Sequence, residues 1–264
     1  MVVPRVAVEG WASLARPALR SGLHVVRRDD GHLQIGIDEP DRVVLPDRPG
    51  LHEALTHLEQ PPPPSVRPDV DRLVGEGWLV DAAAEARARR DAERRRPPVA
   101  LDAAPALEEH LTRACAAASL EVDATGPVHL VMTLGEPPRA VSDTLVREDV
   151  PHLWVALRPG AVRLGPFVEP GRTPCLRCVD AHLGEADPRR ATVLHQLERL
   201  PTASVADLDP SLLVLATAWA VRDVVRRLDG EVPALRAADL TVTDALAVRR
   251  RTWLRHPHCG CAWG

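Results

Sequence analysis

The chain has 264 residues, 45% of them apolar, which suffices for two domains with buried cores. A formal net charge of −4 argues against nucleic acid as the main partner, and the sequence has no apolar run long enough to span a bilayer. The N-terminus does not resemble a signal peptide, so we expect a cytoplasmic protein. All 33 basic residues are arginine and tyrosine is absent, which excludes Schiff-base or Walker-type lysines and a catalytic tyrosine.

Residues 1–82 are expected to form a small winged-helix-like α/β domain. Apolar alternation and turn residues predict elements in the order strand, strand, strand, helix, helix, strand, at residues 23–26, 32–37, 42–45, 50–58, 68–77 and 78–80. The first helix must end before the four prolines at 61–64, and Gly75 or Gly77 can cap the second helix.

Residues 83–98 are rich in alanine and arginine. We expect a charged, solvated helix that links two domains, and a basic contact patch is the alternative. From residue 99 to residue 264 the pattern is that of a second α/β domain, with continuous apolar runs typical of buried strands. The predicted strands are 99–101, 128–133, 152–157, 162–167, 240–243 and 247–253, and the predicted helices are 106–120, 136–149 and 212–228.

Four cysteines form two tight pairs, Cys175 with Cys178 and Cys259 with Cys261. Two short thiol chelates separated by a folded insert are what a closed tetrahedral zinc site needs. We therefore expect one structural Zn²⁺ per chain, bound by these four residues and stabilising the last third of the chain. Disulfides are the alternative for either pair, although a Cys-Gly-Cys bridge is strained, and a redox dithiol at the first pair would leave the second pair unexplained.

Two histidines, His256 and His258, flank the second cysteine pair. Either could replace a cysteine as a ligand or contact the ligands, and the simpler interpretation is a turn around Pro257. The fifth cysteine, Cys115, lies on an alanine-rich helical pattern and is expected to be a core thiol.

The two cysteine motifs, Pro-Gly-Arg-Thr-Pro-Cys-Leu-Arg-Cys at 170–178 and His-Pro-His-Cys-Gly-Cys at 256–261, resemble those of the E1-like (ThiF/MoeB-related) family. The chain looks closest to the subgroup that partners YcaO cyclodehydratases in making azole-modified peptides such as bacteriocins. This resemblance implies an N-terminal winged-helix peptide recognition element (a RiPP recognition element) and a Rossmann-like E1-type domain closed by a four-cysteine zinc site. It also implies a leader peptide and a YcaO-type enzyme as partners, and a homodimer.

The sequence departs from adenylating members of that family where they bind nucleotide. Those enzymes carry a glycine-rich turn after their first strand, whereas residues 102–106 here read Asp-Ala-Ala-Pro-Ala. The lysine for the phosphates is missing too, and Asp102 and Asp123 read as solvated acids at strand ends. We therefore expect no catalytic residues and a degenerate Rossmann-like domain that acts as a non-catalytic partner.

Peptide binding is the function that remains. In related recognition modules a leader peptide joins the sheet as an added strand and inserts apolar side chains into a groove beside a helix. Transferred to this chain, the edge and the groove comprise Val43, Val44, Val70, Leu73, Val74 and Trp78. The alternative interpretation of the helix residues is that they are simply core, and Trp78 could instead pack between domains.

Two other functions stay open. A divergent adenylyltransferase would bind ATP through an unfamiliar loop. A zinc-stabilised winged-helix DNA-binding protein would use residues 68–77 for recognition, but this segment has three acidic residues against one arginine and is poorly matched to phosphate.

Overall fold

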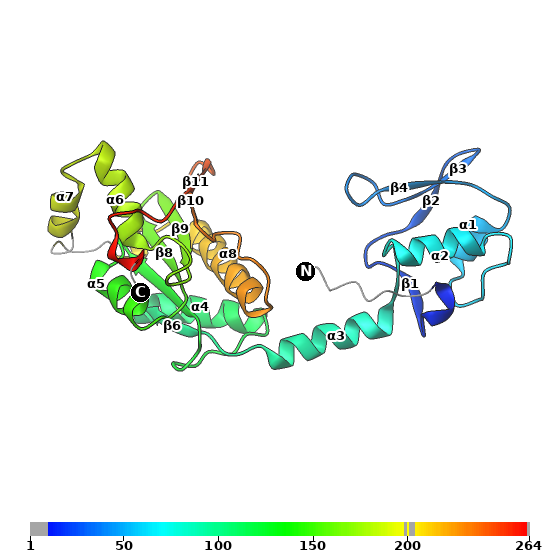
Figure 1. Cartoon of the computed structure of the whole chain (residues 1–264), viewed down its shortest axis with the longest axis horizontal. Coiled ribbons are helices and arrows are strands. Elements are labelled where there is room, and N and C mark those ends of the chain that lie inside the picture. The colour runs from blue at the N-terminus through cyan, green and yellow to red at the C-terminus, as the bar shows by residue number, and fades with distance from the viewer. Residues whose placement is uncertain (1–9, 198–199, 201–203, 263–264) are drawn as a thin grey trace. The chain divides into compact units, whose positions relative to one another are not determined.

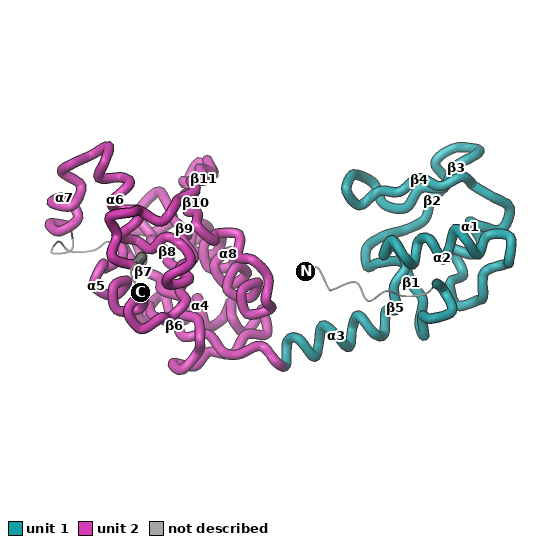
Figure 2. Tube along the Cα trace, viewed as in Figure 1, with its two compact units in different colours: residues 1–94 teal, residues 95–264 magenta. Residues whose placement is uncertain are grey.

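The computed structural model describes residues 10–262 except 198–199 and 201–203. The chain divides into two compact units, unit 1 at residues 1–94 and unit 2 at residues 95–264 (Figure 2). Each unit has a hydrophobic core of its own. Figure 1 labels the elements of both.

Unit 1 is built on a small antiparallel sheet in which β3 lies between β2 and β4. A separate two-stranded sheet pairs β1 with β5. The elements in chain order are η1 (Trp11–Ser13), β1 (Pro17–Leu19), β2 (Val25–Asp29), β3 (His32–Ile35), β4 (Val43–Pro46), α1 (Leu51–Thr56), α2 (Arg67–Gly75), β5 (Leu79–Asp81) and α3 (Ala82–Arg95). The sequence predicted these elements except η1 and β1, with boundaries shifted by a few residues.

The core of unit 1 follows from the two periodicities of strand and helix. Leu33 and Ile35 alternate on β3 and are fully buried, and Val70, Leu73 and Val74 form the inward stripe of α2. Beyond β3, the backbone at residue 36 has φ +77°, and a Cβ there would lie 1.7 Å from the carbonyl oxygen of Asp41. Only glycine fits that turn.

Helix α3 forms over the segment predicted to be helical. Its first turn is capped by Asp81, whose Oδ1 accepts hydrogen bonds of 3.0 Å from the backbone N–H groups of Ala83 and Ala84. None of its residues is buried. No face of this helix therefore belongs to a hydrophobic core.

Unit 2 contains a six-stranded mixed sheet in the order β11-β10-β9-β8-β7-β6, so the fold is mixed α/β. Strands β6 to β8 are parallel, and β8 to β11 are antiparallel. The elements are β6 (Ala100–Ala103), α4 (Pro105–Ala117), β7 (His129–Leu134), α5 (Arg139–Arg147), β8 (His152–Arg158), β9 (Ala161–Val168), α6 (Leu176–Ala186), α7 (Arg190–Leu197), η2 (Val205–Asp207), α8 (Pro210–Leu228), β10 (Ala238–Thr243), β11 (Val248–Thr252) and η3 (Gly260–Ala262).

Helices cover both faces of this sheet. Leu153, Val155 and Leu157 of β8 share one core with α4 and α8, whereas Trp154 of the same strand packs in a second core with residues of α5 and α6. A strand buried on both faces needs apolar residues at every position, which explains the continuous run that predicted it. Among the described residues, no helix is long and apolar enough to cross a membrane.

Candidate functional site

The four paired cysteines come together on the α5–α6 face of the sheet. Cys175 is the N-cap residue of α6 and Cys178 lies in its first turn, while Cys259 and Cys261 belong to the C-terminal turn. One Sγ atom from each lies within 4.8 Å of the others, and individual Sγ–Sγ distances are 3.9 Å (175–178), 3.6 Å (175–259) and 3.3 Å (178–261). A tetrahedral ion with metal–sulfur bonds of about 2.3 Å needs separations of about 3.8 Å. The cluster therefore could hold a metal ion.

The protonation of these thiols also fits a cation site. The hydrogen bond with Cys175 lowers the pKa of Cys178 to about 4, and the same contact raises the pKa of Cys175. Burial raises the pKa of Cys261 to about 12. A bound dication would hold the thiols in their deprotonated form, because metals bind the thiolate.

Most of the cluster is buried, although Cys175, Cys259 and Cys261 also line a hollow of about 900 Å³ together with charged side chains such as those of Asp143 and Arg177. Cys175, Cys178 and Cys259 are each less than a tenth exposed and pack with Trp154 and Leu145. Arg255 attaches the C-terminal turn to the rest of unit 2 by donating to the carbonyl oxygens of Gly171 (2.6 Å) and Cys261 (3.2 Å). Four cysteine ligands leave no open coordination position, so such a site stabilises the fold and does not catalyse.

The flanking histidines do not join the cysteine group. His256 Nε2 lies 3.0 Å from Glu185 Oε1, and the backbone N–H of His258 donates to His256 Nδ1 at 3.2 Å. The chain turns at Pro257, as in the simpler sequence interpretation, and the backbone of His256 also hydrogen-bonds to Cys178, so this histidine contacts the cluster without replacing a cysteine. Cys115 is fully buried in the core of unit 2, as predicted.

The carboxyl edge of the parallel strands, where open α/β sheets bind ligands, lacks the geometry of a nucleotide site. The strand order runs in one direction from β11 to β6, so the described strands contain no switch point where the order reverses. Between β6 and α4 there is only Ala104, and Pro105 at the first helical position has no N–H to donate. This turn therefore offers little to a phosphate group.

An ion-pair network occupies that edge instead, beyond the ends of β7 and β8. Arg139 is 4% exposed and donates to both carboxylate oxygens of Asp180 at 2.8 Å and to the Pro137 carbonyl at 2.7 Å. Glu136 accepts from Arg163 at 3.1 Å and from Arg139 at 3.3 Å. The buried guanidinium and carboxylate groups at this edge are therefore bonded to one another.

The carboxylates of this network stay ionised because arginine side chains lie next to them. Burial alone would raise the pKa of Glu136, but Arg163, Arg139 and Arg158 together lower it. The pKa of Asp180 is likewise lowered, because the attraction of Arg139 and Arg190 outweighs burial. Both carboxylates are therefore ionised at neutral pH, and the edge is filled by paired charges. The sequence contained no signal for this network, since its members lie on separate elements without a common spacing.

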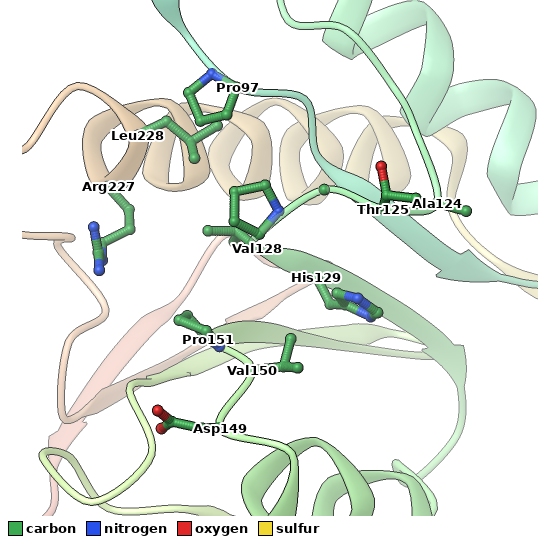
Figure 3. A pocket seen from close by; sticks show the side chains of 12 residues that line it. Pro97, Ala124, Thr125, Val128, His129, Asp149, Val150, Pro151, Arg227 and Leu228 are labelled. Atoms are coloured by element: carbon green, nitrogen blue, oxygen red, sulfur yellow. The ribbon is translucent and has the colours of Figure 1, made fainter.

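A hollow of about 640 Å³ lies at the opposite, amino end of β7 and β8 (Figure 3). Its polar side chains, Thr125, His129, Asp149 and Arg227, do not converge on one point. Arg227 also pairs with Glu169 at 2.8 Å. The arrangement resembles no acid–base or nucleophilic site.

The predicted peptide-binding residues fall into two groups. Val43 and Val44 are half-buried and exposed, respectively, on β4, which pairs only with β3 among the described strands. Val70 and Leu73 have no exposed surface and Val74 only 5%, because they form the core of unit 1.

The sixth predicted residue, Trp78, is half-buried. The guanidinium of Arg20 lies 5.3 Å from its ring centroid, and its Nε1 donates to Glu76 at 3.2 Å. A peptide on the surface of unit 1 could therefore contact Val44 and Trp78, whereas it could reach the buried side chains of α2 only if the core opened.

The comparisons with known proteins identify the fold. No protein-family model and no curated protein sequence matches the chain. Among solved structures, the heterocyclase TruD matches with a TM-score of 0.68 and 20% identity over 94% of this chain and 42% of its own. A heterocyclase in complex with substrate and cofactor matches with a TM-score of 0.69, 19% identity, and coverages of 93% and 39%. Escherichia coli MccB, solved with AMPCPP and MccA, matches with a TM-score of 0.64, 12% identity, and coverages of 94% and 99%.

These likenesses extend over nearly the whole chain, although the chain spans only about two fifths of the heterocyclases. At such low identities they establish a shared fold. The resemblance inferred from the cysteine motifs is confirmed at that level: the chain has the fold of MccB and of part of the heterocyclase TruD.

Proposed function

We propose that this chain is a non-catalytic E1-like partner protein that binds a leader peptide and presents it to a separate, ATP-using YcaO-type cyclodehydratase in azole-modified peptide biosynthesis. The proposal rests on one combination of observations. The chain shares the fold of part of the heterocyclase TruD, and the buried Arg139–Asp180 ion pair lies at the carboxyl edge of its parallel strands. The chain spans 42% of the TruD chain, so the activity of the whole heterocyclase is not assigned to it.

We infer that the chain does not adenylate a substrate, because its first strand–helix turn is poorly suited to phosphate. A nucleotide phosphate needs backbone N–H groups at a helix N-terminus, and the Ala104–Pro105 turn supplies few of them. The sequence also has no lysine to contact a phosphate.

Peptide binding is assigned to unit 1, which we propose to be a winged-helix-like recognition element. Strand β4 is an outer strand of its sheet, so its main chain can pair with an extended peptide. Val44 is 39% exposed there and would contact a neighbouring strand on the same face of the sheet.

For unit 2 we propose one structural Zn²⁺ bound by Cys175, Cys178, Cys259 and Cys261. Thiolate sulfurs in a closed tetrahedral set favour zinc over the harder magnesium and calcium ions. The ion would join the C-terminal turn to α6, and we propose that the molecule acts as a homodimer in the cytoplasm.

A selection of display-library peptides on the full chain tests peptide binding. We expect extended peptides whose affinity falls at least ~10-fold in Val44→Arg, because a charged side chain then faces the added strand. Val26→Arg is the matched control. Val26 on β2 and Val44 on β4 both pair with Gln34 of the central strand β3, so the two variants place the same charge on the two outer strands. Failure to select any peptide, or equal loss in both variants, would contradict binding at β4.

A divergent adenylyltransferase is the second candidate, and it is favoured by one observation. MccB, whose chain is covered to 99%, has been solved with ATP. Calorimetric titration with ATP–Mg²⁺ separates the two functions, because the partner protein should show no binding. Micromolar binding would mean that the Ala104–Pro105 turn accepts phosphate after all.

A further inference from the structure

A second group of metal-ligating side chains lies beside the cysteine cluster and shares no residue with it. It comprises His182 and Glu185 of α6 and His256 of the C-terminal segment, with one donor atom from each within 4.8 Å of the other two. Helix α6 places Cys178, His182 and Glu185 at intervals of four and three residues, and therefore on one face. The C-terminal segment that carries Cys259 and His256 lies against that face.

A hydrogen bond to the backbone sets the tautomer of the His182 ring. Its Nε2 lies 3.0 Å from the carbonyl oxygen of Leu254, which can only accept, so Nε2 carries the proton and Nδ1 keeps its lone pair. Metal-binding histidines characteristically donate their other N–H to a carbonyl or carboxylate. The ring also stacks on Trp253, with centroids 6.1 Å apart and planes inclined at 27°. Trp253 is held in turn by its 2.8 Å bond to Asp239.

His256 and Glu185 bring the other two donors. His256 is 5% exposed and its Nε2 lies 3.0 Å from Glu185 Oε1, whose side chain is 68% exposed. A cation bound at Nε2 would move the ring proton to Nδ1, at the loss of the 3.2 Å bond from the His258 N–H. This loss makes the site weaker than the cysteine cluster.

We propose that His182, Glu185 and His256 bind a second Zn²⁺ ion, which exchanges with solvent and keeps an open coordination position. Two imidazoles and one carboxylate are a zinc ligand set that leaves the fourth position to water or a further ligand. The exposed side chain of Glu185 gives an ion access to the site from solvent. The cysteine cluster holds α6 and the C-terminal segment together, so the three donors need little rearrangement.

Calorimetry and metal analysis on the full chain test this proposal. After zinc loading and washing with a chelating resin, one tightly held ion should remain, and titration with Zn²⁺ should then reveal a second equivalent. Glu185→Gln and His182→Ala are expected to weaken the second equivalent ~10-fold or more and to leave the first unchanged. Glu148→Gln and His110→Ala, which alter the same residue types elsewhere in unit 2, are the matched controls.

The outcomes are distinct. Glu185 is largely exposed, so Glu185→Gln should keep the circular dichroism spectrum of the wild-type chain, and its loss of zinc would report the site itself. Absence of a second equivalent at millimolar Zn²⁺, or its retention in both variants, overturns the proposal. Addition of Co²⁺ to the zinc-filled chain gives a further readout: thiolate-to-metal absorption would place the added ion at the cysteines and also refute the second site.

Discussion

Acid should destabilise unit 2 through a single buried histidine, His152. Its side chain has no exposed surface, and its Nδ1 donates to the Val150 carbonyl at 2.8 Å, whereas Nε2 has no partner among the described residues. Burial, opposed by the Val150 bond and reinforced by His129, lowers its pKa from 6.5 to about 4. The folded chain thus keeps this ring neutral at a pH where the unfolded chain protonates it.

The magnitude follows from the two pKa values. The lowered pKa means that stability is complete above pH 6.5 and is lost as the pH falls toward about 4. Between about pH 7.5 and about pH 5, linkage predicts a loss of about 2 kcal/mol in the free energy of unfolding. The lowered pKa values of Glu136 and Asp180 cost stability mainly below this window, and Asp223, whose pKa is raised by burial, acts in the opposite direction, so the histidine variant is needed to assign the loss.

Urea unfolding followed by tryptophan fluorescence at both pH values measures the loss. His152→Asn should remove most of the pH dependence, because its amide can still donate to the Val150 carbonyl but does not titrate. His152 lies in unit 2, so this variant should alter only the urea transition of unit 2. His110→Gln on α4 is the control and should keep the pH dependence of the wild type. The reasoning is refuted if the wild-type chain loses less than about 0.5 kcal/mol, or if His152→Asn loses as much as the wild type.

Two further predictions concern the cluster and the network. Replacing Cys175 and Cys178 together by serine should unfold unit 2 and leave unit 1 folded, because structural zinc contributes about 10–16 kcal/mol to folding. Limited proteolysis measures this, and Cys115→Ser is the control that should keep the metal. A unit 2 that stays folded without metal would count against the site. Arg139→Ala should cost about 3 kcal/mol by urea unfolding, since Asp180 loses its main partner. The exposed Arg113→Ala should cost less than about 0.5 kcal/mol, and equal losses would show that the network contributes little.

Much of the fold could be predicted from the sequence because the signals are local. The continuous apolar runs at 128–133 and 152–157 correspond to β7 and β8, and helix α8 begins within two residues of its prediction. Helices α6 and α7 and strand β1 are not among the elements predicted from apolar periodicity. Strand β2 extends through Arg27 and Asp29 because its pairing with β3 continues beyond the apolar residues.

The sequence likewise predicted the cysteine cluster, Cys175, Cys178, Cys259 and Cys261. The two members of each pair are close in the chain, so only one folded insert has to bring the pairs together. The spacing of His182 and Glu185 from Cys178 places the three residues on one helix face. Only the folded structure brings His256 close enough to complete a group of three metal-ligating side chains. For the peptide-binding residues, apolar character alone could not separate the buried Val70 from the exposed Val44.

The sequence by itself therefore determined the elements, the cysteine cluster and the absence of a glycine-rich turn, all of which depend on neighbours along the chain. Only the tertiary structure decided the strand order and the pairing of Arg139 with Asp180, which are 41 residues apart. Hydrophobic burial constrains which residues turn inward but not which buried charges meet, because ion pairs require specific geometry between distant elements.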